Sequence, residues 1–169
     1  MGGVVGAFLK RRFEQQKQTN EHDIKIYNQS NEILSEEKLL NIANFEVGAS
    51  KHAIRYDNYS LLENWCTFFE RAGNQYLDKQ TREQSKRLRA SFLILIKFIR
   101  LNFSEIKHQN PNNENIYLRP DLNPDYEDNA TEEQFAEWKE FARELDTLID
   151  EVLDQYSKYR ETVKKKLKI

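Results

Sequence analysis

Apolar residues recur at helical spacings along most of the chain, and the clearest case is the segment 132–167. Its apolar positions alternate at spacings of three and four residues, which predicts a helix packed against several others. The preceding "TEEQ" is a capping box, because Thr131 and Gln134 can each satisfy a backbone N–H group of the other. The expected apolar face consists of Phe135, Trp138, Ala142, Leu145, Ile149, Val152, Tyr156, Tyr159 and Val163.

The same type of pattern predicts two long helices in the middle of the chain, over 82–107 and 54–72. Thr81 in "TREQ" begins a second candidate capping box. The centre of the first of these helices, "SFLILIKFI", is apolar nearly all round, so we expect it to be the most buried segment. Gly73 and Asn74 follow the second helix and are typical of a left-handed helix stop.

The N-terminal third predicts a helix over 4–29 and a short helix over 36–44, the latter with Ser35 as its N-cap. No alternation of apolar and polar residues indicates β-strands. The segment 108–130 is irregular, holds all three prolines and is acidic. A connection of that length in a compact domain is often functional. Its apolar centre, "IYLRPDL", is expected to pack back on the helices.

These elements predict an all-α fold in a single domain, 1–169. The architecture is an up-and-down four-helix bundle with one additional short helix and one long acidic loop. In that topology the first and the last long helix place both chain termini at the same end. We therefore expect two basic clusters to lie side by side as a candidate contact surface. They are Lys10, Arg11 and Arg12, and Lys164, Lys165, Lys166 and Lys168.

Charge is balanced overall but unevenly distributed. The chain carries 26 Lys and Arg and 28 Asp and Glu, so no general positive field favours nucleic acid as a partner. Arg82, Lys86 and Arg89 share one side of a predicted helix, and the overall balance favours a solvated face over a nucleic-acid footprint. Charged residues make up 32 % of the chain and glycine and proline are few, which is typical of a helix-rich domain.

The acidic segment 121–132 has part of the pattern of a calcium-binding loop. Oxygen-bearing side chains stand at all the required spacings: Asp121, Asn123, Asp125, Glu127, Asn129 and Glu132. However, Tyr126 replaces the glycine that such a loop needs at its sharp turn. We therefore favour a solvated acidic loop, with a metal-responsive regulator as the alternative.

No catalytic or cofactor motif is present in the sequence. The chain has neither a nucleophile elbow nor a glycine-rich phosphate loop. Cys66 is the single cysteine and has apolar neighbours, so we expect a buried structural thiol in a reducing compartment. We expect no enzyme activity, no cofactor and no metal, and keep as a further alternative an enzyme with an unrecognised site between the helices.

The opening "MGGVVGAFLKRRF" combines a short apolar stretch with a cluster of cations. It is too short to cross a bilayer, for which about 20 apolar residues are needed. Gly6 stands where a myristoylation motif requires Ser or Thr. The order, apolar residues followed by Lys and Arg, fits the cytoplasmic end of a membrane helix. The alternative is a helix start that covers one end of the bundle.

Four stretches extend this interpretation: "SNEILSEEKL", "FFERAGNQYL", "YLRPDLNPD" and "YSKYRETVKKKLKI". They resemble a group of small uncharacterised bacterial proteins in which an N-terminal membrane helix precedes a cytoplasmic helical domain. The resemblance covers most of the chain and implies that residues 1–9 correspond to the tail of such an anchor. It carries no activity.

We therefore expect a non-catalytic interaction or sensory domain at the cytoplasmic face of a bacterial membrane. Its partners would be an unidentified protein and an anionic lipid surface. The cations at both chain ends would contribute about 1 kcal/mol each to lipid binding.

Overall fold

The computed structural model describes residues 2–43, 53–107, 116–122, 124 and 130–169, and it is predominantly helical, as predicted. The elements in chain order are α1 (Gly2–Ile33), α2 (Glu36–Asn41), β1 (Ile54–Arg55), α3 (Tyr56–Phe68), the 3₁₀ turn η2 (Ala72–Asn74), α4 (Lys79–Asn102), β2 (Phe103–Lys107), β3 (Ile116–Pro120) and α5 (Glu132–Leu167).

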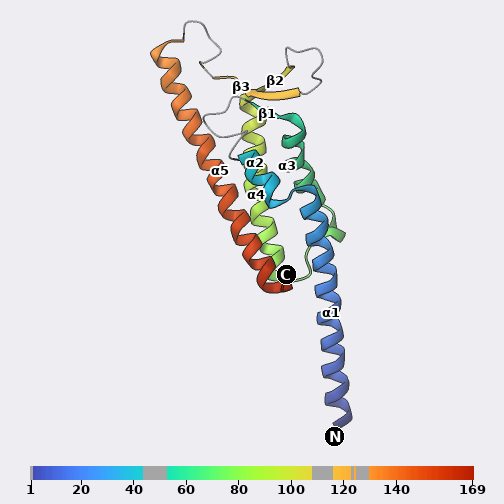
Figure 1. The fold of residues 1–169 in the computed structure, drawn as a ribbon. Helices are drawn as coiled ribbons and strands as arrows, with labels where there is room; N and C mark the ends of the chain where they lie inside the picture. Colours follow the sequence, from blue (N-terminus) through green and yellow to red (C-terminus); the bar gives the residue numbers. More distant parts are fainter. Residues whose placement is uncertain (1, 44–52, 108–115, 123, 125–129) are drawn as a thin grey trace.

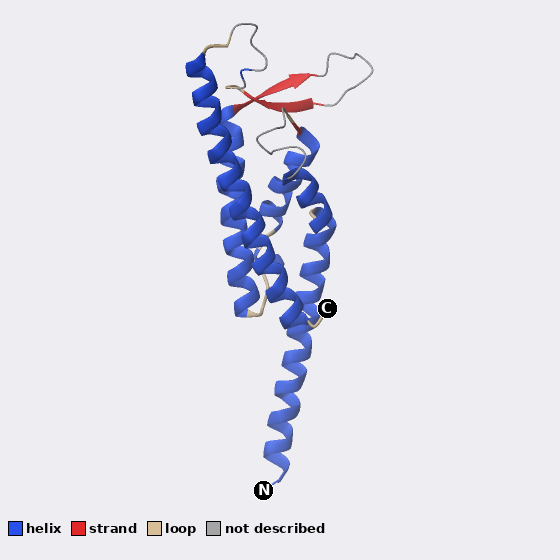
Figure 2. Ribbon diagram, turned by 60° about the vertical axis from the view of Figure 1, so that its left-hand side comes forward, coloured by secondary structure: helices blue, strands red, loops and turns tan. Residues whose placement is uncertain are grey.

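The long helices lie roughly side by side, with α4 packed along α5, α3 against α4, and α1 against α3 and α5. Helices α1 and α4 run toward the strands, whereas α3 and α5 run away from them (Figure 1). We call the end of the body that carries the strands the sheet end. The opposite end, where residues 75–78 connect η2 to α4, is the turn end. The outer part of α1 extends past the turn end, so the N-terminus lies far outside the body (Figures 1 and 2).

A three-stranded antiparallel sheet in the order β1-β3-β2 lies across the sheet end, and the prediction that the chain has no strands was therefore wrong (Figure 2). Ile54 pairs with Leu118, and Phe103 pairs with Pro120 at the other edge of β3. Leu118 is 6 % exposed, so the apolar centre of the predicted loop does pack back on the helices.

Helix α5 begins with the predicted capping box and has the predicted length. Helix α4 starts earlier than predicted, because Asp78 is its N-cap and accepts a hydrogen bond from the Thr81 N–H group at 2.8 Å. It also ends earlier, at Asn102, whose side chain donates to the Phe98 carbonyl. Residues 103–107 continue as strand β2 and not as helix.

Helix α2 has Ser35 as its N-cap, as predicted. The prediction of a left-handed stop at Gly73 and Asn74 was wrong. Both residues belong to η2, and no glycine in the described part of the chain has a positive φ. Helix α3 instead ends at Phe68, where the chain turns into this 3₁₀ segment.

The core is apolar and continuous from the turn end to the sheet end. Its largest fully buried side chains include Trp65, Tyr76, Phe92 and Tyr159. The rings of Trp65 and Phe92 meet edge to face, with centroids 5.2 Å apart, a favourable geometry for aromatic pairs.

Two burial predictions were wrong. Within "SFLILIKFI", Leu93 and Ile94 are 40 % and 56 % exposed, because α3 and α5 cover only part of the surface of α4. Phe135 is 43 % exposed because it lies in the first turn of α5.

Candidate interaction surface at the turn end

A buried carboxylate attaches α1 to the turn end. Asp23 is fully buried, and its two carboxylate oxygens accept hydrogen bonds from the backbone N–H groups of Leu77 and Asp78, at 2.7 and 2.9 Å. The neighbouring His22 donates from Nε2 to the Gln75 carbonyl at 3.0 Å. Hydrogen bonds to a charged acceptor are among the stronger ones in proteins. The position of α1 relative to the start of α4 is therefore fixed at this point.

Three buried hydroxyls join the same helix to α5. The Tyr159 hydroxyl on α5 lies 2.5 Å from the Tyr76 hydroxyl and 3.4 Å from Ser30 Oγ on α1. Burial raises the pKa of Tyr159 to about 12 and raises the pKa of Tyr76 as well, so both are neutral near pH 7. A buried network of satisfied hydroxyls holds three segments in one arrangement.

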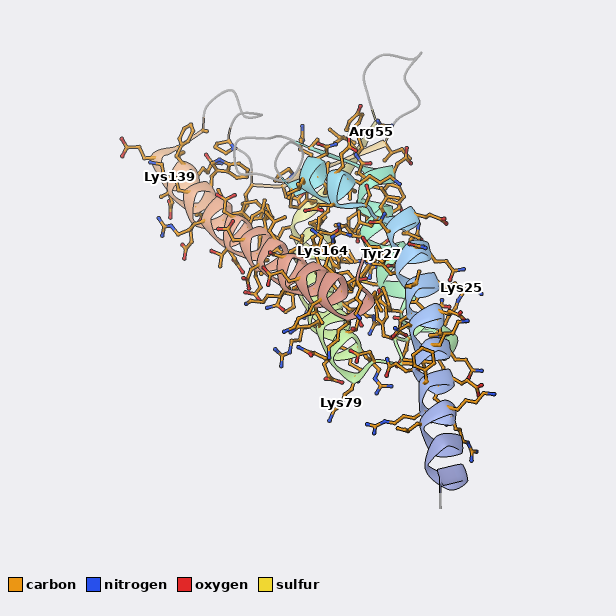
Figure 3. The ribbon with its side chains drawn as sticks, turned by 60° about the horizontal axis from the view of Figure 1, so that its bottom comes forward. Lys25, Tyr27, Arg55, Lys79, Lys139 and Lys164 are labelled. Carbon is orange, nitrogen blue, oxygen red and sulfur yellow. The ribbon has the colours of Figure 1, made fainter. Side chains whose placement is uncertain are left out.

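Arg160 reinforces this junction from the side. Its guanidinium lies 5.3 Å from the centroid of the Tyr27 ring on α1 and 3.3 Å from the Glu36 carboxylate on α2. The Arg160 side chain is only 19 % exposed, so it is a structural cation and not part of the contact surface. Figure 3 shows Tyr27 between α1 and the last turns of α5.

Lys164, Lys165, Lys166 and Lys168 all lie at the turn end, and Lys166 binds back to the body. Its Nζ atom is 3.9 Å from the Asp78 carboxylate. Burial raises the pKa of Asp78, but hydrogen bonds from Thr81 and the charge of Lys166 outweigh this effect and lower it. The other three lysines are exposed.

The start of α4 adds a cation that the sequence patterns did not connect with this cluster. Lys79 follows Asp78 directly, is exposed, and extends from the turn end (Figure 3). Lys79, Lys164, Lys165 and Lys168 are thus exposed on two neighbouring helices at the turn end, and we call them the turn-end cations. Asp78 in "DKQT" is the N-cap signal at the start of α4 that could have placed Lys79 in a first helical turn.

Lys10, Arg11 and Arg12 do not lie beside the turn-end cations as predicted. They lie on the outer part of α1, where residues 9–18 are all exposed and no other element of the described structure lies beside the helix (Figure 1). Arg12 precedes Asp23 by 11 residues, or about 16 Å of helix. Both basic clusters therefore lie toward the same end of the molecule. The cluster on α1 is displaced outward along the axis of α1, away from the turn end where the C-terminal lysines lie.

Apolar side chains accompany the cations on outer α1. Leu9 and Phe13 are 58 % and 75 % exposed and lie one turn apart on one side of the helix. Among the described helices, none combines the length and hydropathy that crossing a bilayer requires. This part of α1 thus presents an exposed amphipathic segment without a packing partner among the described residues.

The opposite charge dominates the first two-thirds of α5. From Glu132 to Asp154 the helix carries nine acidic residues and only two basic ones, Lys139 and Arg143, whereas its last turn is rich in lysine. Because α5 runs from the sheet end to the turn end, its acidic part lies toward the sheet end and its basic last turn lies at the turn end (Figure 1). Such a charge distribution orients a protein on a charged surface.

Neither Cys66 nor the described part of the candidate calcium loop forms a catalytic or metal site. Cys66 is buried, as predicted, and burial raises the pKa of its thiol to about 12, so it is not a ready nucleophile. Half of the candidate calcium loop, at positions 123 and 125–129, lies outside the described residues. Within the described residues, no group of three or more His, Cys, Asp or Glu side chains is placed to hold a metal ion.

Arg82, Lys86 and Arg89 lie together on α4, as predicted, and line a cavity of about 220 Å³. Two of them are engaged: Lys86 pairs with Glu83 at 3.1 Å, and Arg89 pairs with Glu70 and donates to the Cys66 carbonyl. This pairing reduces the positive charge available to an anion.

Comparison with protein-family models, with curated proteins and with solved structures finds no match to this chain.

Proposed function

We propose that the chain is a non-catalytic helical interaction or sensory module held at the cytoplasmic face of a bacterial membrane, with its turn end toward the lipid. In this proposal α1, α3, α4 and α5 act as an up-and-down four-helix bundle with α2 as the additional short helix. Strand β3, which lies within the acidic connection 108–130, is then on the side away from the lipid.

The observation that carries the proposal is the outer part of α1. It continues as a helix beyond the body, it exposes Leu9 and Phe13, and it presents Lys10, Arg11 and Arg12 next to them. An amphipathic basic helix of this kind binds at the boundary between headgroups and acyl chains. Apolar burial and attraction to anionic headgroups would both contribute.

The charge of the body supports the same orientation. The turn-end cations lie on the side from which α1 emerges, and the carboxylates of α5 lie toward the other side. Each surface Lys or Arg near an anionic leaflet contributes about 1 kcal/mol, within a Debye length of about 10 Å at 0.1 M salt. Outer α1 would therefore provide the first contact and the turn-end cations a weaker second one.

Flotation with lipid vesicles tests the proposal. The full chain should float with vesicles of phosphatidylcholine and phosphatidylglycerol, but much less with phosphatidylcholine alone. Binding should fall steeply between about 0.05 and 0.5 M salt. Absence of salt-sensitive binding to the anionic vesicles would disprove lipid contact.

Matched neutral variants assign the contact to a region. Replacing Lys10, Arg11 and Arg12 by Gln should lower the partition coefficient by about tenfold or more. Replacing Lys164, Lys165 and Lys168 by Gln should lower it by a smaller factor. The control removes three exposed cations nearer the sheet end, through Lys97→Gln, Lys139→Gln and Arg143→Gln. If this control weakened binding as much as the first triple variant, the proposed orientation would be wrong.

A further inference from the structure

The second half of α4 exposes three large apolar side chains, Leu93, Ile94 and Leu101, where α3 and α5 leave the helix uncovered. Ile94 and Leu101 are 56 % and 69 % exposed, and they lie two turns apart on the same face as the buried Phe98. Large apolar side chains exposed together at helical spacing, instead of singly, mark an interaction surface. This face lies toward the sheet end, away from the outer part of α1.

Between this face and α5 there is an open groove of about 510 Å³. The Phe98 and Phe141 rings form its floor, with centroids 5.1 Å apart. Ile94 and Leu101 line the α4 side, and Leu122 closes one end. From Ile94 to Asn102 the groove follows about 12 Å of helix, which matches two turns of a helix laid along it.

The α5 side of the groove is acidic. Glu137, Glu140 and Glu144 line it at spacings of three and four, so all three carboxylates follow the same edge. All three are exposed, and within the described part of the chain no ion pair neutralises them. Lys97 is the single cation among the groove-lining residues of the described structure.

We propose that this groove binds an amphipathic, lysine- or arginine-rich helix of a partner protein. Apolar side chains at positions i, i+3 or i+4, and i+7 would pack on Phe98 and Phe141, as in other helix-in-groove complexes. Cations flanking those side chains would pair with the three carboxylates and set the direction of the bound helix. The chain's own segment 125–129 has the wrong charge for this role, with Asp125, Glu127 and Asp128. The inference does not depend on lipid binding.

A model peptide provides the probe. It is an acetylated and amidated helix of about 14 residues, with leucine on one face and lysine on the other. A second peptide keeps the leucines and carries glutamate in place of lysine. Fluorescence anisotropy of labelled peptides with the full chain should show saturable binding of the lysine peptide, and at least about tenfold weaker binding of the glutamate peptide.

Variants of the chain then test each side of the groove. Glu137→Gln, Glu140→Gln and Glu144→Gln together should weaken lysine-peptide binding by about fivefold to tenfold at low salt. The control, Glu133→Gln with Asp150→Asn and Glu161→Gln, removes three exposed carboxylates elsewhere on α5 and should leave binding unchanged. Leu101→Ser should weaken binding by about tenfold. Leu77→Ser, at a side chain that is 52 % exposed near the turn end, should not weaken it.

Each alternative occupant has its own signature. Equal binding of both peptides would show a groove for uncharged apolar ligands and would overturn the proposed partner. Concentration-dependent dimerisation that disappears in the Glu137, Glu140 and Glu144 variant would identify a second copy of this chain as the occupant, which would also overturn it. No binding of the lysine peptide up to about 1 mM, or binding insensitive to every groove variant, would reject the site altogether.

Discussion

At the turn end, distant parts of the sequence are joined by buried polar side chains. At the sheet end they are joined by backbone pairing of short strands and by partly exposed contacts such as Arg100 with Tyr59, and the start of α5 is held by a local cap. Asp23 and the Tyr76–Tyr159 pair connect residues that are more than 50 positions apart. The start of α5 is instead capped by Thr131 and Gln134, which are three positions apart. The turn end is thus built to hold α1 in a fixed direction, and four measurements can test this difference.

The largest effect is expected from Asp23→Ala. The substitution removes a fully buried carboxylate that accepts two hydrogen bonds and leaves the partly buried N–H groups of Leu77 and Asp78 without this acceptor, which should lower the free energy of unfolding by about 3 kcal/mol. Urea denaturation measures this difference. The control is Glu21→Ala on the same helix, at an exposed carboxylate 3.9 Å from Lys17, which should cost less than about 0.5 kcal/mol. Equal losses for the two variants would contradict the role of Asp23.

Alkaline pH should loosen the turn end next. Burial holds the pKa of Tyr159 near 12, whereas an unfolded tyrosine ionises near pH 10. Above about pH 10 the unfolded state binds fewer protons than the folded state, so stability must fall as the pH rises. Tyr159 alone should account for roughly 2–3 kcal/mol between pH 10 and 12. Urea denaturation at each pH measures this loss. In the Tyr159→Phe variant the free energy of unfolding should fall less steeply between about pH 10 and 12. An unchanged slope would exclude Tyr159 as a cause of the alkaline loss of stability.

At neutral pH, Tyr159→Phe should cost about 1–2 kcal/mol, because its hydroxyl connects Tyr76 with Ser30. Tyr156 provides a matched control on the same helix. It is also buried, but within the described residues its hydroxyl makes no hydrogen bond, so Tyr156→Phe should be close to neutral. Thermal unfolding of both variants decides whether the hydroxyl or the ring of Tyr159 matters.

The smallest effect is expected at the sheet end. Thr131→Ala removes the cap of α5 and should cost about 1 kcal/mol, since only local hydrogen bonds are lost. Thr147→Ala, in the exposed middle of α5, should be neutral or slightly stabilising because alanine is the better helix former. If Thr131→Ala destabilised the chain more than Asp23→Ala, the contrast between the two ends would be reversed.

The parts of the fold that depend on local signals were predictable from the sequence. The capping box and the spacing of Leu145, Ile149 and Val152 define α5 without reference to the rest of the chain. The sheet was not predictable, because its strands are short and come from three separate segments. Phe103 and Ile106 continue the apolar spacing of α4, so nothing local marks the change from helix to strand at Asn102.

For the candidate interaction surface at the turn end, the sequence indicated which cations contribute but not how they are arranged. Runs of Lys and Arg identified most of its cations, but not Lys79, because its position depends on which helix ends meet. Asp23 stands in a polar stretch, "NEHDIK", where no spacing distinguishes a buried carboxylate from exposed ones. Lys10, Arg11 and Arg12 are separated from the C-terminal lysines because residues 9–18 of α1 are exposed and burial begins only at Asp23. The sequence predicted the helix itself, over 4–29, but not the point at which it begins to pack on the body.

A pair of fluorescent labels tests the proposed orientation most directly. Cysteine is introduced either by Leu9→Cys on outer α1 or by Lys139→Cys near the sheet end, and is labelled with an environment-sensitive dye. Cys66 can stay, because it is 3 % exposed and the pKa of its thiol is about 12. On addition of anionic vesicles, emission from position 9 should shift to the blue and emission from position 139 should not change. A blue shift at position 139, or none at position 9, would contradict the account.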